Sequence, residues 1–204
     1  MKYIIAIDSG HGSDTKGKQS PDGSLREWEF NKDIEKRLVA LCQEQQINYF
    51  VVHLEDTDVP LSKRKLGIKR FLEVNKDVTL VGVSIHADAF ENEKANGFTL
   101  FYKAKNGDKN GSLASFRLAS IIESTLIESY NKTGISIKSR GVKASPIPDE
   151  IPSYFVLREY PGTWTLIEAG FMTNIKDCDY LKSEYFRNTF AKSVFEGIKR
   201  YCQI

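Results

Sequence analysis

A chain of 204 residues, 41% of them hydrophobic, is long enough for one domain with a substantial core, and its length does not call for a second domain. The 29 Lys and Arg residues nearly balance the 27 Asp and Glu residues, and this net charge of +2 argues against a nucleic-acid-binding protein. The three cysteines are widely spaced and lack a Cys-x-x-Cys pair, which argues against a disulfide framework and a thiolate zinc site.

The first half of the chain alternates predicted strands with predicted helices. Short apolar runs predict strands over residues 3–7, 48–54, 78–85 and 98–102. Apolar side chains at helical spacing predict one helix that begins at or just before Glu27, and a basic helix follows over residues 62–72. The run Lys63-Arg64-Lys65 in that second helix is expected to be a solvated face, which could also favour an anionic polymer.

The second half of the chain continues this alternation. Helical spacing predicts helices over residues 112–130 and 183–201, and short apolar runs predict strands at residues 155–157 and 165–167. Turn-forming residues over 106–111 and three prolines within 144–153 predict irregular loops. Because strands alternate with helices throughout, we expect an α/β fold with a mostly parallel twisted sheet of about six strands, covered by helices on both faces.

Two of the three histidines follow apolar runs. His11 lies between Gly10 and Gly12 after the first predicted strand, and His86 follows the third. Another apolar run, near residue 165, ends in Glu168. In an open α/β sheet the ligand crevice lies outside the carboxyl ends of the strands, so three strands could bring two histidines and one glutamate together. This pattern suggests a metal hydrolase.

A catalytic zinc site usually has three protein ligands, so one more should accompany His11 and His86. The first turn of the predicted helix offers Glu27 and Glu29. These side chains point about 200° apart on a helix, so at most one can face the site, and periodicity does not choose between them. His53 lies inside a predicted strand and is expected to be structural.

Five sequence blocks carry a resemblance to a known family. They are Asp8–Gly12 (DSGHG), Glu27–Asn31 (EWEFN), Ser84–Ala89 (SIHADA), Ser139–Lys143 (SRGVK) and Leu166–Asn174 (LIEAGFMTN). In these blocks and their order, the chain resembles the amidase-3 family of zinc-dependent N-acetylmuramoyl-L-alanine amidases, which detach stem peptides from bacterial cell-wall glycan. Asp88 stands where the family usually has asparagine, and the last block has Ile-Glu-Ala-Gly-Phe in place of Val-Glu-Leu-Gly-Phe.

The resemblance implies a phosphorylase/hydrolase-like fold and a specific set of metal ligands. The family's zinc glutamate stands four residues before a helical asparagine, and Asn31 makes that residue Glu27. Glu29 then lies at the surface near the site, or it contacts a ligand residue without binding the metal itself. His11, Glu27 and His86 are thus implied as ligands of Zn²⁺.

The resemblance also implies roles for two further residues. Glu168 corresponds to the catalytic carboxylate, which takes a proton from the attacking water and returns it to the departing amine. Arg140 is a candidate for substrate binding, because a guanidinium can hold a carboxylate or an oxyanion through paired hydrogen bonds. A loop-anchoring role for Arg140 remains open at this point.

The implied function is hydrolysis of the amide bond between N-acetylmuramic acid and L-alanine in peptidoglycan, during cell-wall lysis or remodelling, by a single catalytic domain over residues 1–204. One alternative is a zinc peptidase or deacylase on the same scaffold. Another is a catalytically inert peptidoglycan-binding module, although the presence of His11, Glu27, His86 and Glu168 speaks against it. The sequence predicts no oligomeric state.

The N-terminal apolar run is too short for a signal peptide, and no run approaches the roughly 20 apolar residues that span a membrane. We therefore expect a protein made in the cytoplasm that reaches the cell wall or periplasm after lysis or by another export route. A phage or prophage endolysin would fit this expectation. An excised catalytic domain of a longer enzyme would have the same sequence features.

Overall fold

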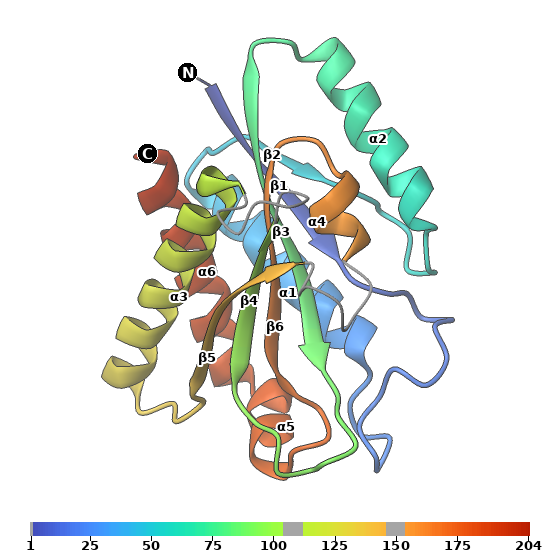
Figure 1. Cartoon of the computed structure of the whole chain (residues 1–204), viewed down its shortest axis with the longest axis vertical. Helices are drawn as coiled ribbons and strands as arrows, with labels where there is room; N and C mark the ends of the chain where they lie inside the picture. The colour runs from blue at the N-terminus through green and yellow to red at the C-terminus, as the bar shows by residue number, and fades with distance from the viewer. Residues whose placement is uncertain (1, 104–111, 146–153) are drawn as a thin grey trace.

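The computed structural model describes residues 2–103, 112–145 and 154–204, and a six-stranded sheet runs through its centre (Figure 1). The strands lie in the order β2-β1-β3-β6-β4-β5. Their bounds are β1 Lys2–Ser9, β2 Tyr49–Val51, β3 Val78–Asp88, β4 Phe98–Lys103, β5 Ser139–Ser145 and β6 Thr163–Phe171. The helices are α1 Glu27–Glu44, α2 Leu61–Val74, α3 Leu113–Thr133, α4 Phe155–Glu159, α5 Ile175–Lys182 and α6 Glu184–Cys202.

Four strands, β2, β1, β3 and β6, run parallel to one another. The other two, β4 and β5, are parallel to each other, but β4 pairs antiparallel with β6. The carboxyl ends of β1, β3 and β6 therefore lie at the same end of the sheet as the amino ends of β4 and β5. Because β6 lies between β3 and β4, it joins the parallel part of the sheet to the antiparallel pair.

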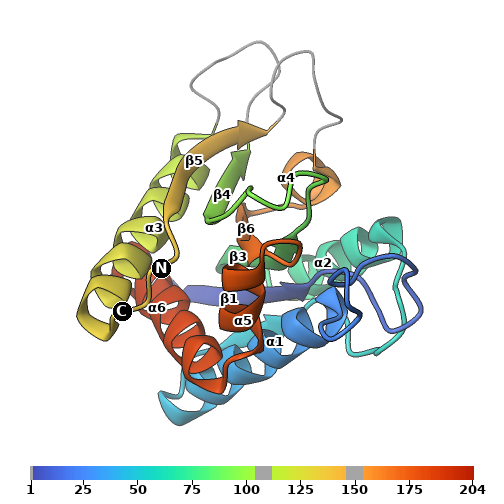
Figure 2. The same ribbon diagram turned by 90° about the horizontal axis from the view of Figure 1, so that it is seen from below.

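Apolar side chains cover both faces of the sheet, as its alternating strand residues require. Along β1, Ile5 and Ile7 belong to one core, whereas Ile4 and Ala6 belong to the other. Helices α1, α3, α5 and α6 complete the first core, and α2 and α4 complete the second (Figure 2). No helix among the described residues combines the length and the apolar character needed to cross a membrane.

The predicted α/β fold is confirmed, including the mostly parallel sheet and the helices on both faces. One predicted strand is wrong, because residues 155–157 begin α4, where Val156 and Leu157 turn into the second core. A short apolar run has no period that distinguishes a strand from a buried helical turn. The sequence did not predict β5 or α5. The loop predicted over 106–111 and residues 146–153 of the second loop lie outside the described residues.

Candidate metal centre

A tight turn after β1 carries His11. Its φ of +63° lies in the left-handed region, which costs a residue with a side chain about 1–2 kcal/mol. The preceding Gly10 donates its N–H to the Ile85 carbonyl of β3 at 3.0 Å. A Cβ atom on Gly10 would overlap the His86 ring, so only glycine lets the turn approach β3 this closely. The turn therefore brings two histidines from different strands together.

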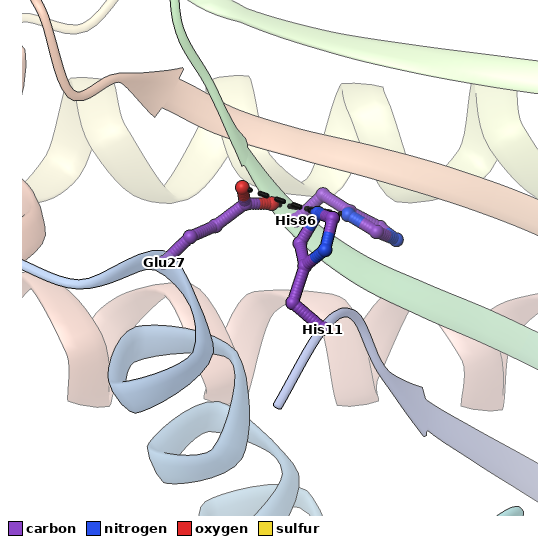
Figure 3. Close-up of side chains that lie close together, drawn as sticks. All are labelled: His11, Glu27 and His86. Carbon is purple, nitrogen blue, oxygen red and sulfur yellow. Dashed lines mark hydrogen bonds and ion pairs between the residues drawn. The ribbon is translucent and has the colours of Figure 1, made fainter. Parts of the chain in front are cut away.

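Glu27 is the first residue of α1, and its buried side chain reaches back to both histidines. Its Oε2 lies 3.3 Å from His11 Nε2, and its Oε1 lies 3.1 Å from His86 Nδ1 (Figure 3). The Ala87 N–H also donates to Oε1, at 3.2 Å. Burial disfavours the charged carboxylate, but the hydrogen bonds from both histidines outweigh it and hold the pKa of Glu27 well below its usual range.

The ligand atoms of His11, Glu27 and His86 all lie within 4.8 Å of one another. The two imidazole rings meet edge to face, with centroids 5.3 Å apart. Two imidazole nitrogens and one carboxylate oxygen form a donor set that catalytic zinc sites use. The structure thus brings together the three residues that the family resemblance implied as ligands.

Glu168 lies on the strand beside these ligands. The prediction that its strand ends there is wrong, because β6 continues to Phe171, and Glu168 pairs in parallel register with His86 of β3. Its side chain is buried, and its Oε2 atom has no hydrogen-bond partner among the described residues. Burial, together with the charges of Glu27 and Asp88, raises the pKa of Glu168 well above its usual value. A buried, unpartnered carboxylate oxygen is rare and is typical of a functional group.

The structure separates Glu27 from the other acidic candidate in the same turn. Glu29 is exposed and lies outside the group of ligand atoms. Asn31 donates from Nδ2 to the Gly10 carbonyl at 2.9 Å, so it supports the turn that carries His11. His53 lies after the end of β2 and not inside it as predicted; it is buried, with its Nε2 3.0 Å from the Ser9 carbonyl, outside that group.

Arg140 makes the contacts expected of a loop anchor. It is exposed at the start of β5, and its Nη1 donates to the Asn96 carbonyl at 3.2 Å. Its guanidinium carbon lies 5.0 Å from the centre of the Phe171 ring. These contacts tie the loop between β3 and β4 to β5 and β6. The role of Arg140 in substrate binding stays a prediction.

A cavity of about 210 Å³ opens beside the two histidines on the α2 and α4 side of the sheet. Its wall includes Asp8, Arg64 and Tyr154, none of which the sequence analysis proposed as a site residue. The prediction that Arg64 lies on a solvated face is wrong, since the residue is only 2% exposed. Helical spacing could have indicated this position, because Arg64 lies four residues before the buried Ile68 on the same helix face.

The close approach of Gly10 to His86 gives a direct prediction. Gly10→Ala should displace the His86 ring and lower kcat/KM by about 10²-fold, the effect of misplacing a reacting group by about 1 Å. The activity of the purified variant, measured together with its metal content, checks this result.

Gly67→Ala is the matched control for that substitution. A Cβ atom on Gly67, inside α2, would meet only the Val52 carbonyl oxygen, at 3.9 Å. The control should therefore keep its activity and gain up to about 1 kcal/mol of stability, because alanine favours a helix interior more than glycine does. Equal activity of Gly10→Ala and Gly67→Ala would contradict the proposed role of the close approach.

Comparisons with a family model and with known proteins agree on one family. The family model Amidase_3, described as N-acetylmuramoyl-L-alanine amidase, matches residues 5–200. The chain is 26% identical over 197 residues to the N-acetylmuramoyl-L-alanine amidase LytC of Bacillus subtilis (strain 168), an alignment that covers 97% of this chain and 35% of LytC. It is 23% identical over 206 residues to the germination-specific N-acetylmuramoyl-L-alanine amidase of the same strain, covering 97% of this chain and 79% of the relative.

Solved structures show the same fold. The crystal structure of an N-acetylmuramoyl-L-alanine amidase from Clostridium difficile 630 superposes on this chain with a TM-score of 0.80 and 26% sequence identity. The superposition covers 99% of this chain and 97% of that one. The candidate ligands His11, Glu27 and His86 and the neighbouring Glu168 all lie within the residues that the family model matches.

Proposed function

Because the chain belongs to the amidase-3 family of N-acetylmuramoyl-L-alanine amidases, we propose that it is a Zn²⁺-dependent hydrolase of the amide bond between N-acetylmuramic acid and L-alanine in peptidoglycan. The observation that carries this proposal is the convergence of His11, Glu27 and His86 beside the buried Glu168. A module that only binds peptidoglycan would not need a buried carboxylate with an unpartnered oxygen next to three metal-ligating side chains.

The donor set fits Zn²⁺. His11 and His86 both direct a ring nitrogen at the Glu27 carboxylate, so a cation held by all three groups would replace contacts that the side chains already make with one another. Two neutral imidazoles and one carboxylate would leave the ion with a net positive charge. Zn²⁺, when bound, supplies Lewis-acid chemistry, which polarises a substrate carbonyl and lowers the pKa of water.

Glu168 would move the proton in this reaction. Its Oε2 atom, which has no hydrogen-bond partner among the described residues, can accept a proton from the attacking water and hold it until the amide bond breaks. The same group would then protonate the departing amine, which is a poor leaving group without a proton. Its register beside His86 places it on the strand next to the ligands.

Product analysis on purified sacculi tests the proposal. The amidase should release intact stem peptides that carry a new amino group on L-alanine. A peptidase would cut within the peptides and leave their first residue on the glycan, and a deacylase would release an acyl group instead. Binding to sacculi without any released amine, by a protein that retains no zinc, would contradict the enzymatic function.

Removal of the metal should abolish the activity. Dialysis against a chelator is expected to reduce amide hydrolysis to the background rate, because His11, Glu27 and His86 alone cannot polarise the substrate carbonyl. Added Zn²⁺ should restore the rate, as measured by amine release from sacculi. Protein dialysed against the same chelator already saturated with Zn²⁺ is the control and should stay active. Full activity in a sample shown by metal analysis to be free of zinc would contradict the assignment.

A further inference from the structure

Arg64 extends from α2 to the turn that carries His11, and it is almost completely buried in the wall of the cavity beside the two histidines. Its guanidinium makes five hydrogen bonds. They run from Nε to Val59 O (2.8 Å), from Nη1 to Asp8 Oδ1 (2.9 Å) and Ser9 O (2.7 Å), and from Nη2 to Asp58 Oδ1 (2.9 Å) and His11 O (3.4 Å).

These contacts use the whole donor capacity of the side chain. A guanidinium carries five N–H groups, and each of them has an acceptor within the protein. Arg64 therefore has no N–H left for a substrate, although it lines the cavity next to His11 and His86. Its position indicates a role in holding the protein itself.

The turn that Arg64 holds is strained. His11 has a left-handed backbone conformation, and such conformations persist only where the surroundings fix them. Arg64 donates to the carbonyls on both sides of Gly10, those of Ser9 and His11. Asn31 holds the Gly10 carbonyl itself. The three consecutive carbonyls up to and including His11 thus each accept a hydrogen bond from a distant side chain.

Asp8 fixes Arg64 in turn. The Asp8–Arg64 ion pair is buried, with each side chain 1% exposed, and the second Asp8 oxygen accepts a hydrogen bond from Ser84 Oγ at 2.9 Å. A buried pair of this kind contributes little net stability but strongly restricts geometry. Because Asp8 lies on β1 and Ser84 on β3, the pair ties the guanidinium to the two strands that lead to the histidine ligands.

We propose that Arg64 is a positioning residue that fixes the backbone of His11 for metal binding, an inference that rests on the proposed zinc-dependent function. The planar fork is essential to this role, because it serves the Ser9 and His11 carbonyls and Asp8 from one rigid group. A lysine at position 64 keeps the charge but offers a single ammonium, which cannot span all of these acceptors.

Zinc affinity of Arg64→Lys, measured by competition with a chromogenic chelator, tests the proposal. Loss of a partner that orients a metal ligand typically weakens metal binding by 10–100-fold, so the dissociation constant for Zn²⁺ should rise by at least about tenfold. The value of kcat/KM at subsaturating zinc should fall in parallel. A dissociation constant within twofold of the unmodified protein would overturn the proposal.

Ile68→Ala is the matched control. Ile68 is a fully buried residue on the same face of α2, and its side chain has no atom that could form a hydrogen bond with the turn. It should lower the melting temperature yet leave zinc affinity unchanged. Equal weakening of zinc binding in Ile68→Ala and Arg64→Lys would show a general loss of stability and overturn the positioning role.

A second variant keeps the test decisive if Arg64→Lys does not fold. Asp58→Asn weakens one of the five Arg64 contacts and the hydrogen bond that Thr15 Oγ1 donates to Asp58 Oδ2 at 3.1 Å, at a side chain that is 44% exposed, so folding should be preserved. Its dissociation constant for Zn²⁺ should rise by a few fold, and an unchanged value would contradict the proposal. Failure of the unmodified protein to bind Zn²⁺ would instead contradict the proposed function, which separates the two conclusions.

Discussion

Glu168→Gln should lower kcat by about 10²–10⁴-fold while the purified protein keeps its full complement of zinc. The amide has nearly the same shape as the carboxylate but cannot take a proton from water or return one to the leaving amine. Because Glu168 is not one of the three proposed ligands, His11, Glu27 and His86, the metal should remain bound. Amine release from sacculi and metal analysis of the same sample measure the two effects separately.

Stability measurements should show that this loss of activity is not a loss of folding. The pKa of Glu168 is raised by burial, so the metal-free folded state holds its proton more tightly than the unfolded state, and ionisation at neutral pH costs stability. This cost grows as the pH rises above the unfolded pKa of about 4.3. The melting temperature of metal-free Glu168→Gln at pH 7 should therefore equal or exceed that of the unmodified protein.

Glu29→Gln is the matched control for the same chemical change. Glu29 is exposed on α1, two residues after a proposed ligand, and it makes no contact with the group of ligand atoms. Its replacement should leave kcat and zinc content unchanged. Wild-type turnover by Glu168→Gln would show that another group transfers the proton.

His86→Ala should lose both zinc and turnover. The substitution removes one of three ligand atoms and one of the two imidazoles that contact Glu27. The loss of affinity should exceed the 10–100-fold typical of an outer partner, because a ligand itself is missing. Metal analysis after dialysis, together with amine release, measures both effects.

The contrast between His86→Ala and Glu168→Gln divides the site into a part that binds metal and a part that moves the proton. His86 and Glu168 occupy the same register position on adjacent strands, so each variant alters the site at the same level of the sheet. Zinc retained by His86→Ala at the level of the unmodified protein would remove His86 from the ligand set.

Local sequence patterns predicted the parts of the fold in which burial is periodic. Strand β1 was predictable because Ile4–Ile7 is buried on both faces, and α1 because Phe30, Ile34 and Leu38 follow a helical period. Strand β5 escaped prediction because most of its residues are only partly buried at the edge of the sheet and show no apolar run. The run at 155–157 was too short to have a period.

The sequence also predicted part of the site, but local patterns alone could not identify all of its residues. The positions of His11 and His86 after apolar runs indicated a shared site, and the structure brings their rings together. Periodicity did not choose between Glu27 and Glu29; the spacing to Asn31 in the family did. Helical spacing to Ile68 could have indicated that Arg64 is buried, but its acceptors Asp8 and Ser9 are more than 50 positions away in the chain, where no local pattern reveals them.

The order of the strands also affects when the active centre can form during synthesis. Strand β6 is the last strand in the chain, but it lies between β3 and β4, so the β2-β1-β3 and β4-β5 parts of the sheet remain unconnected until it is made. A nascent chain that ends before residue 163 already contains all three proposed metal ligands, yet it lacks Glu168. The strand that completes the sheet also delivers the proposed base, which couples the onset of hydrolysis to the final step of sheet assembly.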